Sequence, residues 1–102
     1  MNELISIVIP TFNHAQYLER CLKSVESQTI SNYEIIVVDN HSTDNTKNIV
    51  DNFKHLPIKY LLIHNEGIYA KSRNLGIKNS SGDIIAFLDS DDWWKENKLK
   101  ES

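Results

Sequence analysis

The chain has 102 residues, of which 40% are hydrophobic and 25% charged, and its formal net charge is −3. These values are typical of one soluble globular domain, and the acidic balance argues against a nucleic-acid-binding surface. A single cysteine, Cys21, excludes an intrachain disulfide and favours a reducing compartment, so we expect a cytoplasmic domain. No segment of the chain is long and apolar enough for us to predict a transmembrane helix.

The first strand and helix are predicted from apolar runs and periodicity. The stretch Leu4–Ile9 predicts a buried strand, and Pro10 is expected to end it because proline cannot donate to a ladder. Asn13, followed three residues later by Gln16, resembles a capping box. Apolar residues then recur at helical spacing, which predicts a helix from about Ala15 to Ser27 with the cysteine packed on its buried face.

The rest of the chain repeats this alternation of strand and helix. Further strands are expected at Glu34–Val38, Ile58–Ile63 and Ile84–Leu88, and further helices at Asp44–Lys54 and Ile68–Lys78. The continuous apolar run of the last strand favours a central position with both faces covered. The order βαβαβαβ predicts an α/β fold with a mainly parallel four-stranded sheet, flanking helices and right-handed crossovers.

Polar residues follow three of the predicted strands. They are Thr11, the pair Asp39 and Asn40, and the pair Asp89 and Asp91. Ligands of parallel sheets bind beyond the carboxyl ends of the strands, and two side chains two residues apart on an extended backbone point the same way. Because divalent cations with phosphate favour carboxylate oxygens, we expect a metal–phosphate site here. The alternative is a solvated acidic turn in which Asp92 caps a following helix.

Four segments, taken together, resemble the nucleotide-binding half of a family 2 glycosyltransferase with the Rossmann-like GT-A fold. They are Ser6–Asn13, Glu34–Asp44, Ser72–Gly76 and Phe87–Asp92. The resemblance covers nearly the whole chain, so residues 1–102 are expected to form the nucleotide-sugar-binding part, without the acceptor half. It implies an inverting transfer of sugar from a nucleotide-diphosphate donor to a glycan or lipid-linked acceptor. The full-length enzyme would be cytoplasmic or membrane-peripheral.

The resemblance also implies roles for individual residues. It assigns nucleotide binding to Pro10, Thr11, Asn13, Asp39, Asn40, Arg73, Asp89 and Ser90, and binding of Mg²⁺ or Mn²⁺ to Asp91 and Asp89 of the DXD motif. Many members carry Asp where this chain has Asn40, but an amide oxygen can still accept from the imino N–H of uracil or guanine. The base therefore stays open. The general base of such enzymes lies beyond the motif and is expected C-terminal to Ser102.

Two other functions compete with this interpretation. The chain could be a non-catalytic nucleotide-sugar-binding or interaction module, or a haloacid-dehalogenase-like phosphatase, whose motif the segment Ile84–Asp91 resembles. The phosphatase family begins with that motif, whereas three strand–helix units precede it here. Trp93 and Trp94 are expected either to stack on a sugar or base or to cover a core edge. An exposed aromatic pair at the C-terminal edge also favours self-association.

Overall fold

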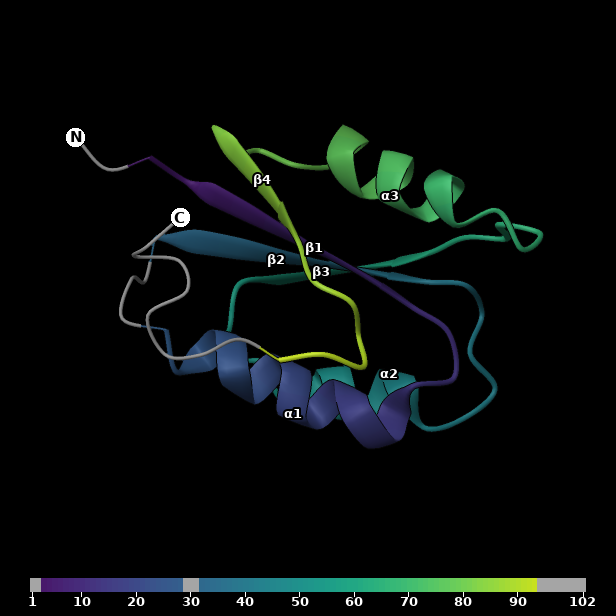
Figure 1. The fold of residues 1–102 in the computed structure, drawn as a ribbon. Helices are drawn as coiled ribbons and strands as arrows, with labels where there is room; N and C mark the ends of the chain where they lie inside the picture. Colours follow the sequence, from purple (N-terminus) through teal and green to yellow (C-terminus); the bar gives the residue numbers. More distant parts are fainter. Residues whose placement is uncertain (1–2, 29–31, 94–102) are drawn as a thin grey trace.

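The computed structural model describes residues 3–28 and 32–93, which form an α/β sandwich (Figure 1). The elements are β1 (Ile5–Thr11), α1 (Ala15–Glu26), β2 (Tyr33–Asp39), α2 (Thr46–Asp51), β3 (Ile58–Leu62), α3 (Tyr69–Lys78) and β4 (Ile84–Phe87). The strands form one parallel sheet in the order β3-β2-β1-β4. The predicted fold class is therefore confirmed. Within these residues no helix reaches the length and apolarity that a membrane crossing requires.

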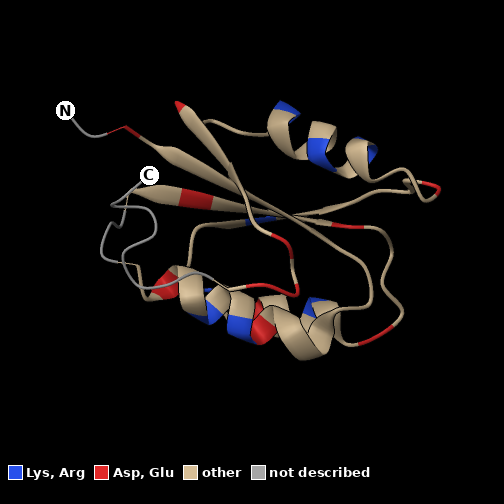
Figure 2. Ribbon diagram, viewed as in Figure 1, with Lys and Arg blue, Asp and Glu red and all other residues tan. Residues whose placement is uncertain are grey.

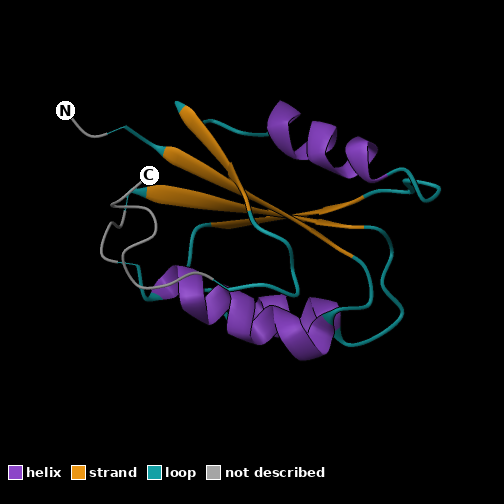
Figure 3. Cartoon of the chain, viewed as in Figure 1, coloured by secondary structure: helices purple, strands orange, loops and turns teal. Residues whose placement is uncertain are grey.

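Helices cover both faces of the sheet, with α1 and α2 on one side and α3 on the other (Figure 3). Alternate residues of the central strands enter two separate cores. Ile7 and Ile9 of β1 pack in the cluster that contains α1, whereas Val8 packs beneath α3 with Ile36 and Val38 of β2. Because both faces of the two central strands are buried, these strands carry continuous apolar runs, Ile7–Ile9 in β1 and Ile35–Val38 in β2, which is typical of parallel sheets.

The strand order places a topological switch point between β1 and β4. The chain proceeds outward from β1 to β2 and β3, and then returns to pair β4 with the opposite side of β1. Right-handed crossovers in the two directions put their helices on opposite faces of the sheet. In open α/β sheets, ligands bind at such a reversal, in the crevice beyond the carboxyl ends of the strands.

The prediction that the last strand is central is wrong for the described residues. β4 pairs with β1 alone and forms an edge, so Ile84 and Phe87 are 45% and 41% exposed. The apolar run was a sound sign of a strand, but it could not tell how many neighbours the strand has. Trp93 is also exposed, and the guanidinium carbon of Arg20 lies over its ring, 4.0 Å from the centroid of the Trp93 ring. Trp94 and the segment that follows lie outside the described residues.

Pro10 does not end the first strand as predicted, since β1 continues through it to Thr11. The Val8 carbonyl accepts from Leu88 on the β4 side, and the backbone of a strand repeats its direction every second residue. The nitrogen of Pro10 therefore also faces the β4 side, where the ladder has already ended. A proline at this position removes no hydrogen bond from the sheet.

The predicted capping box is also wrong, although α1 begins where it was expected. Asn13 has a positive φ of 52°, and its side-chain oxygen accepts from the Thr43 backbone N–H at 2.7 Å. The cap comes instead from Asp44, whose carboxylate accepts from the Ala15 N–H at 3.0 Å and from the Thr46 N–H at 3.1 Å. One carboxylate thus joins the N-termini of α1 and α2, a long-range contact that no local pattern indicates.

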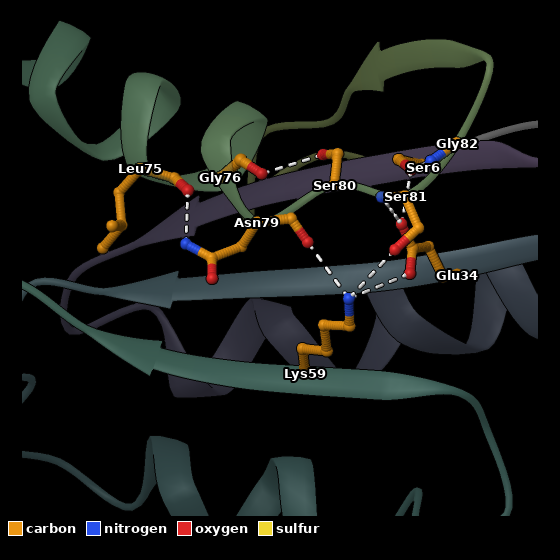
Figure 4. Close-up of polar contacts among 9 residues, drawn as sticks. All are labelled: Ser6, Glu34, Lys59, Leu75, Gly76, Asn79, Ser80, Ser81 and Gly82. Atoms are coloured by element: carbon orange, nitrogen blue, oxygen red, sulfur yellow. Dashed lines mark hydrogen bonds and ion pairs between the residues drawn. The ribbon is translucent and has the colours of Figure 1, made fainter.

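A buried polar cluster ties the amino end of the sheet to the loop before β4 (Figure 4). Glu34 of β2 accepts from the Ser6 hydroxyl and from the Ser81 N–H, both at 2.6 Å, and pairs with the Lys59 ammonium at 3.4 Å. The Ser6 oxygen accepts in turn from the Gly82 N–H at 2.8 Å. These contacts anchor the start of β4, and so they set the position at which its carboxyl end emerges.

Candidate functional site

An open pocket of about 320 Å³ lies at the switch point, beyond the carboxyl ends of β1 and β4 and against the start of α3. Its lining residues are Pro10, Thr11, Phe12, His14, Asn65, Tyr69, Ser72, Arg73, Asp89, Ser90 and Asp91. Figure 2 shows acidic residues on the segment after β4, while Lys and Arg lie along α3. Among the described residues that line the pocket, Arg73 is the one Lys or Arg side chain.

The structure brings together most, but not all, of the predicted site residues. The ones that line this pocket are Pro10, Thr11, Arg73, Asp89, Ser90 and Asp91. Sequence reasoning missed Phe12, His14, Asn65, Tyr69 and Ser72, which also line it. Phe12 had a usable signal, because an aromatic residue immediately after a strand ends can reach a ligand there. The others are His14, directly before α1, Asn65 in the loop after β3, and Tyr69 and Ser72 in the first turn of α3, where the helical pattern says nothing about a pocket.

Thr11 lines this pocket, and its hydroxyl has no hydrogen-bond partner among the described residues. Thr11 is only 5% exposed, and its Oγ1 is a buried side-chain atom without a hydrogen-bond partner in the described structure. Buried hydroxyls are nearly always hydrogen-bonded, since leaving one unpaired costs roughly 1–3 kcal/mol. An unpaired hydroxyl at a pocket wall is therefore a natural contact for a polar ligand atom.

The acidic turn after β4 is held by one side chain from the first turn of α3 and one from the residue before α1. The Tyr69 hydroxyl donates to Asp89 Oδ1 at 2.7 Å, and His14 Nδ1 lies 2.7 Å from the Oγ of the buried Ser90. Asp91 is exposed and accepts no hydrogen bond from the described residues. Two carboxylates therefore stand at the pocket mouth, one restrained and one free.

These carboxylates are the type of ligand that a hard divalent cation prefers, but there are too few of them to hold the cation alone. Asp89 and Asp91 supply oxygen donors of the type that Mg²⁺ and Mn²⁺ prefer. Within the described residues, no group of three or more His, Cys, Asp or Glu side chains could hold a metal ion on its own. A cation at this turn would therefore need oxygens from a bound ligand, which is how Mg²⁺ commonly binds with phosphates.

Arg73 lies close to two aromatic rings at the α3 side of the pocket. Its guanidinium carbon is 4.9 Å from the Tyr69 ring centroid and 5.0 Å from that of Phe87. Stacking of this kind orients a guanidinium and leaves its N–H edge available to an anion. The turn and this arginine thus place negative and positive groups around one opening.

Three predicted nucleotide ligands lie outside the pocket lining. Asp39 is 2% exposed, and its carboxylate accepts from the Ser42 N–H at 2.9 Å and from the Tyr60 hydroxyl. Asn13 hydrogen-bonds to Ser42 and Thr43, and so it links the loop after β1 to the loop after β2. Asn40 lies closer to the pocket wall, because its Oδ1 accepts from the backbone N–H of Asn65 at 3.0 Å.

The loops after β2 and β3 form one connected wall. The rings of His41 and His64 stack with centroids 3.8 Å apart, next to the contact between Asn40 and Asn65. The Asn65 amide then donates to the buried Ser72 hydroxyl of α3 at 2.9 Å. This chain of contacts links the end of β2 to the helix that carries Arg73.

Two residues near the turn have strongly shifted acid–base properties. Burial, the hydrogen bond to Asp89 and the charge of that carboxylate together raise the pKa of Tyr69 to about 12, so its hydroxyl stays a donor at neutral pH. Burial, with the charges of Asp92, Asp91 and Asp89, raises the pKa of Cys21 to about 12. Cys21 is fully buried, which confirms the predicted packing role.

Comparisons of sequence and of structure with known proteins both find glycosyltransferases. The family model "Glycosyl transferase family 2" matches residues 6–101. "Glycosyltransferase GlyG" of Streptococcus pneumoniae is 41% identical over 102 residues, covering 98% of this chain and 34% of that protein. The Escherichia coli enzyme WfgD, "UDP-Glc:alpha-D-GlcNAc-diphosphoundecaprenol beta-1,3-glucosyltransferase", is 44% identical over 101 residues, covering 95% of this chain and 38% of the enzyme.

Among solved structures, S. aureus TarS 1-349 in complex with UDP-GlcNAc has a TM-score of 0.89 and 34% sequence identity. The alignment covers 95% of this chain and 29% of that one. This chain spans about a third of the length of the curated relatives it matches. The likeness is thus to the N-terminal portion of a GT-A domain.

Proposed function

Because the chain belongs to glycosyl transferase family 2, we propose that the pocket binds a nucleotide-diphosphate sugar and forms the donor side of a sugar transfer to an acceptor hydroxyl. The observation that carries the proposal is the placement of Asp89, Asp91 and Arg73 around one pocket whose wall holds an unpaired buried hydroxyl. A diphosphate needs positive groups and hard-cation ligands, whereas a nucleoside needs polar and aromatic walls. This pocket offers all of these.

The nucleoside is proposed to lie against the end of β1. Thr11 would donate or accept through its unpaired hydroxyl, and the half-exposed ring of Phe12 can stack on a base. Asn40 would contact the base or ribose through its amide group. The carboxylate of Asp39 already accepts hydrogen bonds within the protein, so Asp39 would hold this wall in place and would not contact the nucleoside directly. We propose uridine as the nucleoside, because WfgD and the TarS complex are both described with UDP sugars.

The diphosphate is proposed to lie between the acidic turn and Arg73. Asp91 and Asp89 would hold Mg²⁺ or Mn²⁺ together with phosphate oxygens, and the bound ion would neutralise charge on the leaving nucleotide. Arg73, whose guanidinium contacts the rings of Tyr69 and Phe87, would bind the same anion from the α3 side. The net charge of −3 makes such local cations necessary for binding an anionic donor.

The remaining parts of the reaction are proposals about the whole protein. We propose that residues 1–102 supply donor binding, and that the acceptor site and the carboxylate general base of an inverting transfer belong to other parts of the enzyme. Glu66 is a poor candidate base, since it lies on an exposed loop, pairs with Lys71 at 3.8 Å and does not line the pocket. The acceptor is proposed to be a glycan or a lipid-linked sugar, which would favour a membrane-peripheral cytoplasmic enzyme.

Asp91→Asn should weaken binding of UDP in the presence of Mn²⁺ by at least about tenfold, which corresponds to about 1.4 kcal/mol. The amide keeps the size of the side chain but removes the charge that attracts the cation. Titration calorimetry with and without Mn²⁺ measures the effect, and the thermal unfolding midpoint checks that the fold is unchanged. Equal affinity of the variant and the parent would remove Asp91 from the metal site.

Asn40→Ala tests the nucleoside side of the pocket independently. Binding of UDP should weaken to a similar extent with Mn²⁺ and with a chelator, because the lost contact is to the base or ribose. The same panel with GDP in place of UDP tests the base. If the variant changes the metal dependence but not the metal-free affinity, the nucleoside has been placed on the wrong side of the pocket.

A further inference from the structure

Asp89 is held by a contact that the proposed function does not require. Tyr69 opens α3, and its hydroxyl donates to Asp89 Oδ1 at 2.7 Å from the other side of the pocket. Among the described residues, this is the side-chain hydrogen bond that reaches the Asp89 carboxylate, whereas Asp91 has none. The two acids of the same turn are therefore not equivalent before a ligand arrives.

The same tyrosine also positions the cation of the pocket. Arg73 lies one helical turn after Tyr69, and its guanidinium contacts both the Tyr69 ring and the ring of Phe87 in β4. One residue thus contacts the acid by its hydroxyl and the arginine by its ring. These two contacts bring the start of α3 and the end of β4 together at the pocket mouth.

Tyr69 contributes little to the cores of the domain. It is 43% exposed and is absent from both buried clusters of the described residues. A tyrosine placed only for packing would be more buried than this, because an aromatic ring stabilises mainly through the area that it removes from water. Its contacts instead point to the pocket.

We infer that Tyr69 is a positioning residue for donor binding: its hydroxyl holds the Asp89 carboxylate, and its ring holds Arg73, in the orientation that receives the diphosphate. This inference rests on the proposed function. A carboxylate and a guanidinium that are already oriented lose less conformational freedom when they bind a ligand, and so bind it more tightly. Nothing in the chain's motifs marks this position, since it lies before the Ser72–Gly76 segment.

Tyr69→Phe keeps the ring on Arg73 and removes the hydroxyl, which donates to Asp89 and also interacts with the Arg73 guanidinium. The affinity for UDP with Mn²⁺ should fall about five- to tenfold, which is within the range of one typical net hydrogen bond. With a chelator the affinity should change little, since the effect acts through the metal-binding carboxylate. Tyr33→Phe, at the opposite end of the sheet, is the matched control and should bind as the parent does.

A double-mutant cycle shows whether the hydroxyl acts through Asp89. In an Asp89→Asn background, Tyr69→Phe should cost much less than it does in the parent, because the charge that it positions is gone. In the ligand-free chain, the carboxyl carbon resonance of Asp89 should shift on Tyr69→Phe, while that of Asp91 should stay in place. This second readout reports the contact itself and needs no ligand.

The outcomes distinguish this inference from the proposed function. If the parent binds UDP with Mn²⁺ and Tyr69→Phe binds equally well, the positioning role is overturned and the proposed function stands. An equal loss in both Asp89 backgrounds also overturns it, since the hydroxyl would then touch the donor directly. If the parent shows no metal-dependent binding of UDP, the proposed function fails and the inference fails with it.

Discussion

Replacing Gly82 with alanine should lower the free energy of unfolding by about 3 kcal/mol, the upper part of the range for overpacked sites. A Cβ at this position would lie 2.4 Å from the Ser6 Oγ and 2.8 Å from both the Leu4 carbonyl oxygen and the Ser6 nitrogen. The last two atoms belong to the backbone leading into and within β1, which cannot move without disturbing the pairing on both of its sides. The start of β4 would have to move instead.

Chemical denaturation measures this loss, and Gly67→Ala is the matched control. Gly67 has a φ of +79°, but an added Cβ there would meet no atom within 4 Å. Its cost should be about 1 kcal/mol, from backbone strain alone. Ser6→Ala in the Gly82→Ala background removes the hydroxyl but leaves the backbone clash, so it should recover little stability. A Gly82→Ala loss no larger than that of Gly67→Ala would show that the loop adapts.

Glu34→Ala should be nearly as destabilising, by roughly 2–3 kcal/mol. It removes the acceptor of the Ser6 hydroxyl and the Ser81 N–H, and it leaves the Lys59 ammonium without its carboxylate partner. Removing one member of a buried network leaves the others unpaired, which costs more than the pair itself is worth. The value lies below the range for fully buried ion pairs because Lys59 is 46% exposed.

This carboxylate also predicts a pH dependence of stability. Burial opposes ionisation of Glu34, but the hydrogen bonds from Ser6 and Ser81 and the charge of Lys59 outweigh it and lower the pKa. A lowered folded-state pKa means that the stabilisation is fully present above the unfolded value, about 4.3, and is lost as the pH falls through the folded value. Glu34→Gln should therefore lose less stability than the parent between neutral pH and pH about 3.

The measurement is the free energy of unfolding across this pH range for the parent and for Glu34→Gln. Glu19→Gln is a suitable control, because Glu19 pairs with Lys23 at 2.9 Å on an exposed helix surface. Exposed pairs of this kind contribute roughly 0–1 kcal/mol and little pH dependence. Parallel curves for the parent and Glu34→Gln would show that the carboxylate is not preferentially ionised in the folded chain.

Local pattern predicted the elements well because each element buries its own stripe or face. The helix at Ala15 and the strand at Ile84 both begin at the predicted residue. Local pattern failed where a structural feature depends on a residue that is distant in the sequence. Pro10 is tolerated inside β1 because β4 is short, and Asp44 caps a helix that lies before it in the chain. Neither relation leaves a periodic signal around the residue concerned.

By itself, the sequence determined that strands and helices alternate, and that Thr11, Asp89 and Asp91 lie at or just beyond the carboxyl ends of strands, along one edge of a parallel sheet. Hydrophobic periodicity encodes these features, since it follows from which face of an element must leave water. Only the tertiary structure decided that β4 returns beside β1, which opens the pocket between them, and that Tyr69 and His14 reach the acidic turn. His14 and Ser90 are 76 residues apart, and their meeting depends on strand order and helix placement. Those are properties of the packed whole, because the same elements could bury their apolar faces in another strand order.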